Sequence, residues 1–290
     1  MGMKTQETRI TSTEALFPFL ENIKNQFYFR GYSNYDWHMR PSLGRGNERL
    51  IQDEITIIQE FVKIPSLEKL EMKVGNLHEL LELGQHYGLP TRLLDWTTNP
   101  FVALYFALGE KYSDNSILSI ALISRDNSEI TNDWSEINDI IPVQLTLSDW
   151  DSKTLGEMDS LLLSDVEKFE PLKTRVTHPL FPDKFNKFID EMNDKLLIKY
   201  QANSFNERIK KQDGLFTIHK EVRTAMPYAL FDGIVTIELD SLNKSDVSET
   251  LSLVYRINKN ETFPDPPDGS SLDEVRKWCE KTRKSYQTIA

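Results

Sequence analysis

The chain has 290 residues, 39% of them hydrophobic, and a formal net charge of −11. Such an acidic chain lacks the general excess of Lys and Arg that sequence-independent binding of nucleic acid requires. Cys279 is the only cysteine, which excludes an intramolecular disulfide and a cysteine metal cluster. The first residues do not resemble a signal peptide, and no apolar run approaches the ~20 residues of a membrane span, so we expect a soluble cytoplasmic protein.

Helical and strand signals already alternate near the beginning of the chain. Thr11 and Glu14 suit a capping box, although Pro18 lies within the helix that they would open. Pro65 and Gly88 end two later stretches in which apolar residues recur at helical spacing. The predicted elements in order are a helix over 11–25, a strand over 26–32, and helices over 51–62 and 76–88.

Residues 85–107 read QHYGLPTRLLDWTTNPFVALYFA, in which a short apolar strand is followed at once by a helix. Asn99 suits the N-cap of that helix, and Pro100 suits its first position. Polar groups on a buried strand cost free energy unless they are paired or used. The density of such groups here therefore suggests a functional site: Arg92, Asp95, Thr97 and Thr98.

The remaining patterns mix helices and strands without regular β-α-β alternation. They predict a helix over 100–111, a strand over 117–123, an acidic segment over 124–175, a helix over 185–200, strands over 215–219 and 233–239, and a helix over 271–284. This order favours an α+β fold with a compact mixed sheet flanked by helices. We expect a single domain over 1–290, with a helical and acidic insertion over 125–205.

Four motifs of the chain together resemble the FRG domain family. They read FYFRGYSNYDWHMRPSLGR, EITIIQEF, QHYGLPTRLLDWTTNPFVALYFA and, near residue 215, QDGLFTIH. The family is named for the Phe-Arg-Gly that stands here at 29–31. Further residues match its pattern: Trp37, Pro41, Arg45, Glu54, Phe61, Gln85, His86, Asp95 and Trp96. Many members are similar to bacterial or phage-associated proteins.

A second resemblance, to the ADP-ribosyltransferase fold, rests on the aromatic strand ending in Arg-Gly and on a later strand that ends in Thr-Thr. It implies that NAD is the substrate, that Arg30 supports the dinucleotide, and that Trp96-Thr97-Thr98 shape the nicotinamide-ribose site. In that fold a Ser stands where this chain has Trp96. The resemblance also implies a Glu that steadies the positively charged sugar, for which there are three candidates: Glu221, Glu238 and Glu261.

The chemistry of NAD cleavage assigns a task to each kind of side chain. The planar guanidinium groups of Arg30 and Arg92 suit pyrophosphate oxygens. An aromatic ring from Tyr28, Tyr32 or Trp96 suits stacking on nicotinamide. The predicted catalytic residues are Arg30, His86, Asp95, Thr97 and Glu221. The predicted NAD-binding residues are Arg30, Gly31, Gln85, Arg92, Trp96, Thr98, Gln212 and His219, with no metal expected.

Each of these residues also has a structural interpretation. Arg30 can pair with Asp95 and hold two strands together. Asp95 can instead cap the turn at Asn99 or receive Arg92. His86, just before a Gly-Pro break, suits a hydrogen-bonded helix end.

Three functions follow from these alternatives. The first is an NAD-dependent ADP-ribosyltransferase or NAD glycohydrolase that acts as a toxin or antiphage effector, with a protein or nucleic acid as acceptor. The second is a phosphoester hydrolase or nuclease that uses a metal or a histidine base with Glu54, His86, Arg92 and Asp95. The third is a non-catalytic sensor of a nucleotide or a phage protein. A phage or antitoxin partner fits any of them, and no membrane association is expected.

Overall fold

A computed structural model describes the chain at residues 6–32, 39–68, 77–109, 117–127, 176–177, 179, 181–192, 200–201, 207–224, 233–238, 241–262 and 272–287. The chain divides into two compact units. The first comprises Met1–Gly46, Arg92–Asn132 and Asp194–Ser270, and the second comprises Asn47–Thr91, Asp133–Asn193 and Ser271–Ala290. A single domain with an insertion over 125–205 stays a prediction, because most of that segment lies outside the described residues.

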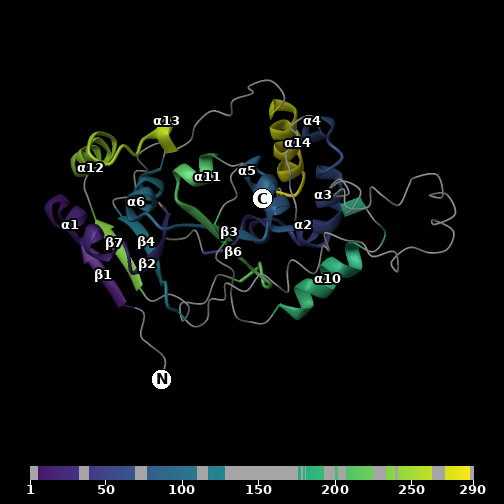
Figure 1. The fold of residues 1–290 in the computed structure, drawn as a ribbon, viewed down its shortest axis with the longest axis horizontal. Coiled ribbons are helices and arrows are strands. Elements are labelled where there is room, and N and C mark those ends of the chain that lie inside the picture. The colour runs from purple at the N-terminus through teal and green to yellow at the C-terminus, as the bar shows by residue number, and fades with distance from the viewer. Residues whose placement is uncertain are drawn as a thin grey trace, which may run out of the picture. The chain divides into compact units, whose positions relative to one another are not determined.

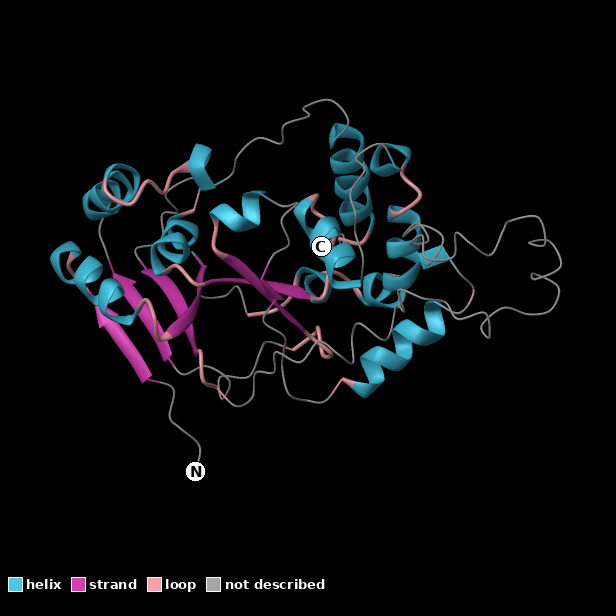
Figure 2. Ribbon diagram, in the orientation of Figure 1, coloured by secondary structure: helices cyan, strands magenta, loops and turns pink. Residues whose placement is uncertain are grey.

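A seven-stranded mixed sheet, ordered β1-β7-β4-β2-β3-β6-β5, forms the centre of the first unit (Figure 2). The edge strand β1 pairs with β7 in parallel, and all other neighbouring strands are antiparallel. This mixed sheet with its helices confirms the predicted α+β class. The strands are β1 (Gln6–Ile10), β2 (Phe27–Tyr32), β3 (Leu93–Thr97), β4 (Ile117–Ser124), β5 (Tyr200–Gln201), β6 (Gly214–Ile218) and β7 (Gly233–Glu238).

Three helices, α1, α6 and α12, pack on one face of this sheet (Figure 1). Side chains alternate along a strand, so every second residue of the central strands contacts them: Phe29, Leu118, Ile120, Leu122, Val235 and Ile237. The helical segments of the first unit are α1 (Thr13–Ile23), the 3₁₀ helix η1 (Ser42–Arg45), α6 (Pro100–Leu108), α11 (Glu207–Lys211), α12 (Ser241–Leu253) and α13 (Lys259–Thr262).

Gly31 allows α6 to approach β2 closely. A Cβ atom at this position would stand 1.7 Å from the carbonyl oxygen of Ala103, in the middle of α6. Only glycine fits such a contact between a strand and a helix backbone. The glycine of the Phe-Arg-Gly motif therefore has a packing role.

The opposite face of the sheet carries a smaller aromatic cluster. Tyr28, Tyr32 and Trp96 lie there with Leu94 and Leu215, and each of the three aromatic residues is at most 8% exposed. Arg125 lies over the Tyr28 ring, with its guanidinium carbon 5.5 Å from the ring centre. This face, which α1, α6 and α12 leave open, carries the candidate site.

The second unit is helical in its described part. Its helices are α2 (Glu48–Gln52), α3 (Glu54–Phe61), α4 (Pro65–Glu68), α5 (Leu77–His86), α10 (Phe181–Glu191) and α14 (Leu272–Ser285). The C-terminal helix joins the earlier ones through a hydrogen bond between Ser66 and Glu274 and through the rings of Phe61 and Trp278. The Tyr286 hydroxyl, just beyond α14, donates to the Asp53 carboxylate at 2.8 Å.

The structure corrects several predicted element boundaries. Ser12, not Thr11, caps α1, because its hydroxyl accepts from the Ala15 amide at 3.3 Å. The predicted helix over 51–62 is divided into α2 and α3. Tyr200 lies in strand β5 rather than at the end of a long helix, because pairing with β6 overrides the helical spacing. Among the described residues, no helix is both long and apolar enough to cross a membrane.

Candidate functional site

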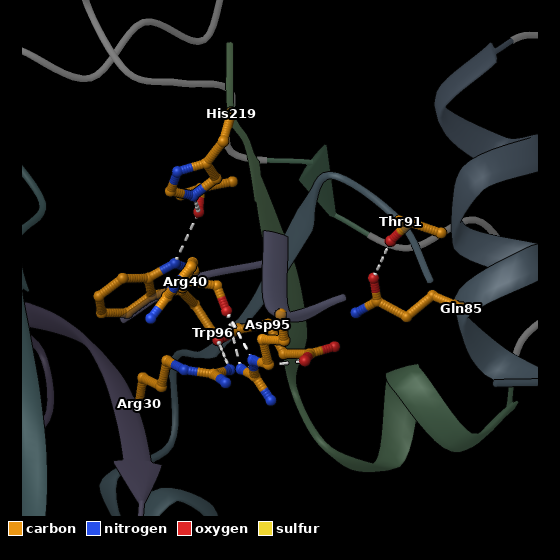
Figure 3. A network of polar contacts seen from close by, with 9 residues as sticks. Arg30, Arg40, Gln85, Thr91, Asp95, Trp96 and His219 are labelled. Carbon is orange, nitrogen blue, oxygen red and sulfur yellow. Dashed lines mark hydrogen bonds and ion pairs between the residues drawn. The ribbon is translucent and has the colours of Figure 1, made fainter. Parts of the chain in front are cut away.

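The sheet opens between β2 and β3. These strands share one register pair, Phe29 with Thr97, whereas β2 pairs with β4 along its whole length. The Arg30 side chain bridges the opening: its Nη1 donates to the main-chain carbonyl of Asp95 at 2.7 Å and lies 3.4 Å from the Asp95 carboxylate. The guanidinium therefore takes the place of a strand partner for Asp95 (Figure 3).

Arg30 is largely withdrawn from water, whereas its carboxylate partner is not. The side chain of Arg30 is 17% exposed and that of Asp95 is 61% exposed. Burial lowers the pKa of Arg30, and the nearby Asp95 carboxylate opposes that shift. The predicted structural interpretation, in which Arg30 pairs with Asp95 and joins two strands, agrees with this geometry.

Two further arginines, Arg40 and Arg45, lie close to Arg30. Arg45 donates from Nε and Nη2 to the main-chain carbonyl of Arg40, at 3.0 and 2.8 Å. Desolvation and the positive charges of Arg30 and Arg40 lower the pKa of Arg45 to about 10, against the opposing effect of Asp95. We call these three residues the arginine cluster; Figure 3 shows Arg30 and Arg40 beside Trp96 and Asp95.

Gly44 fixes the loop that carries Arg40 and Arg45. A Cβ atom on Gly44 would stand 1.5 Å from the carbonyl oxygen of Val222, so the two backbones are in direct contact. Nη1 of Arg40 also lies 3.4 Å from the Gly44 carbonyl. The segment after β6 thus holds η1 in place, and the arginine cluster is positioned by two segments far apart in sequence.

A buried polar chain runs beside the arginine cluster through Trp96, Thr217 and His219 (Figure 3). The Trp96 indole N–H donates to the Thr217 hydroxyl at 2.9 Å, and that hydroxyl lies 2.9 Å from Nε2 of His219. Burial, followed by the positive charges of Arg30 and Arg92, lowers the pKa of His219 to about 3. His219 is therefore neutral near pH 7, and the Thr217 hydroxyl has a proton to donate to its Nε2.

Arg92 is engaged with the main chain at the end of β6. Its Nη1 donates to the His219 carbonyl at 2.6 Å and lies 3.4 Å from the Lys220 carbonyl. Arg92 is 4% exposed, so these carbonyls satisfy a buried guanidinium. These contacts of Arg92 do not favour the prediction that Arg30 and Arg92 share a pyrophosphate.

The described contacts of the Thr97 hydroxyl lie away from the arginine cluster. Thr97 shares its register position with Phe29, whose side chain lies on the face covered by α1 and α6, whereas the next residue of β2 is Arg30. The Thr97 hydroxyl donates to the Gln212 carbonyl at 2.7 Å and accepts from the Asn99 amide at 3.0 Å. These contacts of the Thr97 hydroxyl do not include Arg30, and the predicted convergence of Arg30 with Thr97 and Thr98 stays a prediction.

The segment after Thr98 anchors the beginning of α6. The Asn99 side chain accepts from the Phe101 amide at 3.0 Å, which confirms the predicted cap. The Thr98 amide donates to the Asp213 carbonyl at 3.0 Å, and the Gln212 side chain donates to the Thr262 carbonyl at 2.9 Å. Thr98 and Gln212 thus serve local architecture in the described structure.

The three candidate glutamates differ in their contacts. Glu238 forms an ion pair with Arg9, and Glu261 lies 3.7 Å from Lys211. Glu221 is exposed and accepts a hydrogen bond from the Arg223 amide at 2.7 Å. Because Glu221 directly precedes Val222, which contacts Gly44, it is the glutamate that the chain brings to the segment beside the arginine cluster.

Gln85, His86 and Glu54 belong to the second unit, whereas Arg92 and Asp95 belong to the first. Gln85 hydrogen-bonds Thr91, and the His86 ring meets Tyr87 edge-on with ring centres 4.9 Å apart. The phosphoester hydrolase predicted from Glu54, His86, Arg92 and Asp95 stays a prediction, because its residues are divided between the two units. Within the same described ranges, no group of three or more His, Cys, Asp or Glu is placed to hold a metal ion.

The fold is an α+β module. At the opening of its sheet, the arginine cluster concentrates positive charge in an otherwise acidic chain. Residues 25–116 match the FRG domain, so the chain contains an FRG domain over that stretch. The match includes β2, η1, β3 and α6 of the first unit and helices α2 to α5 of the second. Neither a curated protein nor a solved structure matches the chain.

Sequence reasoning did not select Arg40 or Thr217 for the site. Arg40 lies five residues before Arg45 around a Pro-Ser-Leu-Gly turn, a spacing that can bring two guanidinium groups together. Thr217 lies on β6 two residues before His219, which directly follows the strand, and this spacing brings their side chains together. Both patterns are present in the sequence, but the segments that bring these residues to the site lie far from them along the chain.

Proposed function

We propose that the FRG domain binds the phosphate groups of NAD and consumes NAD, either by ADP-ribosyl transfer or by hydrolysis of the nicotinamide–ribose bond. The observation that carries this proposal is the place of Arg30, which lies in the opening of the sheet with two further arginines and the Asp95 carboxylate. Guanidinium groups match phosphate oxygens in both charge and planar geometry.

The chemical step needs a carboxylate, and Glu221 is the best candidate. Loss of nicotinamide builds positive charge on the ribose, which a nearby carboxylate stabilises. The nicotinamide–ribose bond breaks and nicotinamide leaves as a neutral molecule. Water or an acceptor group then bonds to the ribose carbon and releases its proton to the solvent. Glu238 and Glu261 are engaged in ion pairs with Arg9 and Lys211, whereas Glu221 is exposed next to the segment that contacts η1.

The Thr97 hydroxyl has no part in this proposal, because its contacts lie with Gln212 and Asn99. The geometry thus supports binding of the phosphates more directly than it supports the cleavage chemistry. In a bacterium, consumption of NAD in the cytoplasm suits a toxin or an antiphage effector. Its acceptor would be a protein or a nucleic acid, and a phage protein or an antitoxin would control it.

The test is incubation of the purified full chain with NAD and measurement of nicotinamide release. We expect Arg30→Ala to lower the rate by about two orders of magnitude while the circular dichroism spectrum stays that of the wild type. Arg9→Ala is the matched control, because it removes an arginine from β1 of the same unit and leaves the arginine cluster intact.

Substitution of each of the three candidate glutamates tests the assignment of Glu221. Glu221→Gln should bind NAD and release no nicotinamide, whereas Glu238→Gln and Glu261→Gln should keep the wild-type rate. If the wild type releases no nicotinamide and transfers no label from NAD to any protein or nucleic acid in a bacterial lysate, the enzymatic proposal is wrong. If Arg30→Ala turns over NAD at the wild-type rate, the site assignment is wrong.

A further inference from the structure

The arginine cluster is a concentration of positive charge that the described structure does not neutralise. In the described part of the chain, the ion pair of Arg30 with Asp95 is the one salt bridge made by these three guanidinium groups. Asp95 contributes a single carboxylate and is 61% exposed. Among the described residues, the cluster therefore carries an excess of positive charge at neutral pH, although the chain as a whole is acidic.

The fold holds these charges together against their repulsion. The contact of Gly44 with the Val222 carbonyl and the two hydrogen bonds from Arg45 to the Arg40 carbonyl fix the loop next to Arg30. The charges of Arg30 and Arg40 act together with desolvation to lower the pKa of Arg45. Packing that brings like charges together is typical of a site that receives an anion.

Part of the hydrogen-bonding capacity of the cluster is unused. The Nε atoms of Arg30 and Arg40 are buried and have no hydrogen-bond partner in the described structure. Arg45 is the exposed member and uses one edge of its guanidinium on the Arg40 carbonyl, so its other edge is available to a ligand. A buried, unpartnered donor costs free energy that a bound oxyanion would recover.

We infer that Arg40 and Arg45 complete, together with Arg30, a binding site for pyrophosphate or another phosphate group that carries more than one negative charge. This inference rests on the proposed function for the identity of the natural ligand, and it specifies which residues hold its phosphate end. A single carboxylate would leave positive charge unbalanced and would match one guanidinium group only. A pyrophosphate presents enough oxygens for several planar donors at once.

The experiment is calorimetric titration of the full chain with inorganic pyrophosphate and, for comparison, with acetate, at low salt and near-neutral pH. We expect pyrophosphate to bind with a dissociation constant below about 1 mM and acetate not to bind measurably. Arg45→Gln and Arg40→Gln should each weaken pyrophosphate binding by about tenfold or more. Arg45→Lys should bind better than Arg45→Gln, because it keeps the charge and loses only the planar geometry.

The matched control is Arg49→Gln, which removes an equal charge from an exposed arginine on α2. It should bind pyrophosphate as the wild type does, and all variants should keep the wild-type circular dichroism spectrum and melting temperature without ligand. Absence of pyrophosphate binding to the wild type, or equal binding by Arg45→Gln and Arg49→Gln, would overturn the inference.

The same proteins separate this inference from the proposed function. If pyrophosphate binds at the arginine cluster but the wild type does not consume NAD, the anion site stands and the enzymatic proposal is wrong. If NAD is consumed but substitution of Arg40 and Arg45 changes neither pyrophosphate binding nor turnover, the inference is wrong and the proposed function stands.

Discussion

His219 lies in an environment very different from that of a free side chain. Its ring is 2% exposed, lies at hydrogen-bonding distance from Thr217, and is held neutral by burial and by the charges of Arg30 and Arg92. A neutral imidazole next to an arginine cluster contributes no further positive charge. It also keeps the polar chain from Trp96 satisfied without an ion.

Because the pKa of His219 is lowered in the folded protein, the free energy of unfolding depends on pH in acidic solution. The unfolded chain takes up a proton near pH 6.5, whereas the folded protein does so only near pH 3. The stability that neutral His219 contributes is therefore complete above about pH 6.5 and is lost as the pH falls through this window, by about 3 kcal/mol at pH 4. Urea unfolding at pH 7 and pH 4 measures this loss.

His219→Gln is the variant that isolates this effect. Glutamine offers an oxygen to the Thr217 hydroxyl but does not titrate, so the variant should lose less stability than the wild type between pH 7 and pH 4. Equal losses in the two proteins would show that other groups cause the acid sensitivity.

The contact between β2 and α6 explains why the Phe-Arg-Gly motif needs all three of its residues. Phe29 is fully buried under the helices, Arg30 bridges the opening of the sheet, and Gly31 touches the backbone of α6 at Ala103. Each residue of the motif thus serves a different neighbour. The motif joins the core of the first unit to the arginine cluster within one strand.

Gly31→Ala should destabilise the protein by roughly 3 kcal/mol or more, because the added methyl group collides with the carbonyl oxygen of Ala103 and strand and helix must separate. Gly88→Ala is the control: it meets no atom within 4 Å but has a φ of 91°, so its cost comes from backbone strain alone, about 1 kcal/mol. Urea unfolding of both variants tests the ranking, which a smaller loss for Gly31→Ala would contradict.

The division into two units has a consequence for the whole chain. The arginine cluster, Trp96 and His219 all belong to the first unit, whereas α3, α5 and α14 belong to the second. The residues that match the FRG domain belong to both units. Residues 47–91 belong to the second unit, and the matched residues before and after them in the sequence belong to the first. We therefore expect a ligand at the arginine cluster to stabilise segments of the first unit.

Hydrogen exchange measured with and without pyrophosphate tests this localisation. We expect slower exchange over residues 27–32, 39–46 and 92–97, because the bound anion stabilises the segments that carry or contact the arginines. Exchange in α14 should stay unchanged. Protection confined to the second unit would place the anion elsewhere.

Local sequence signals are sufficient for part of this protein. The aromatic run with Arg30 and Gly31 predicts β2, and Asn99 with Pro100 predicts the beginning of α6, because strand alternation and helix capping depend on neighbouring residues only. The resemblance to the FRG domain and the α+β class also follow from the residues in order. Arg30 stands out for the same reason, as a charged residue on an aromatic strand.

Contacts between segments that are distant in the sequence determine the strand pairing and the assembly of the candidate site. The sequence contains no local signal that β1 joins β7 in parallel, that β2 and β3 share one register pair, or that Gly44 meets Val222. Those pairings place Arg30 with Arg40 and Arg45 and direct the contacts of the Thr97 hydroxyl to Gln212 and Asn99. Strand register and backbone contacts depend on how the whole chain closes its core, and that closure is a property of the folded molecule.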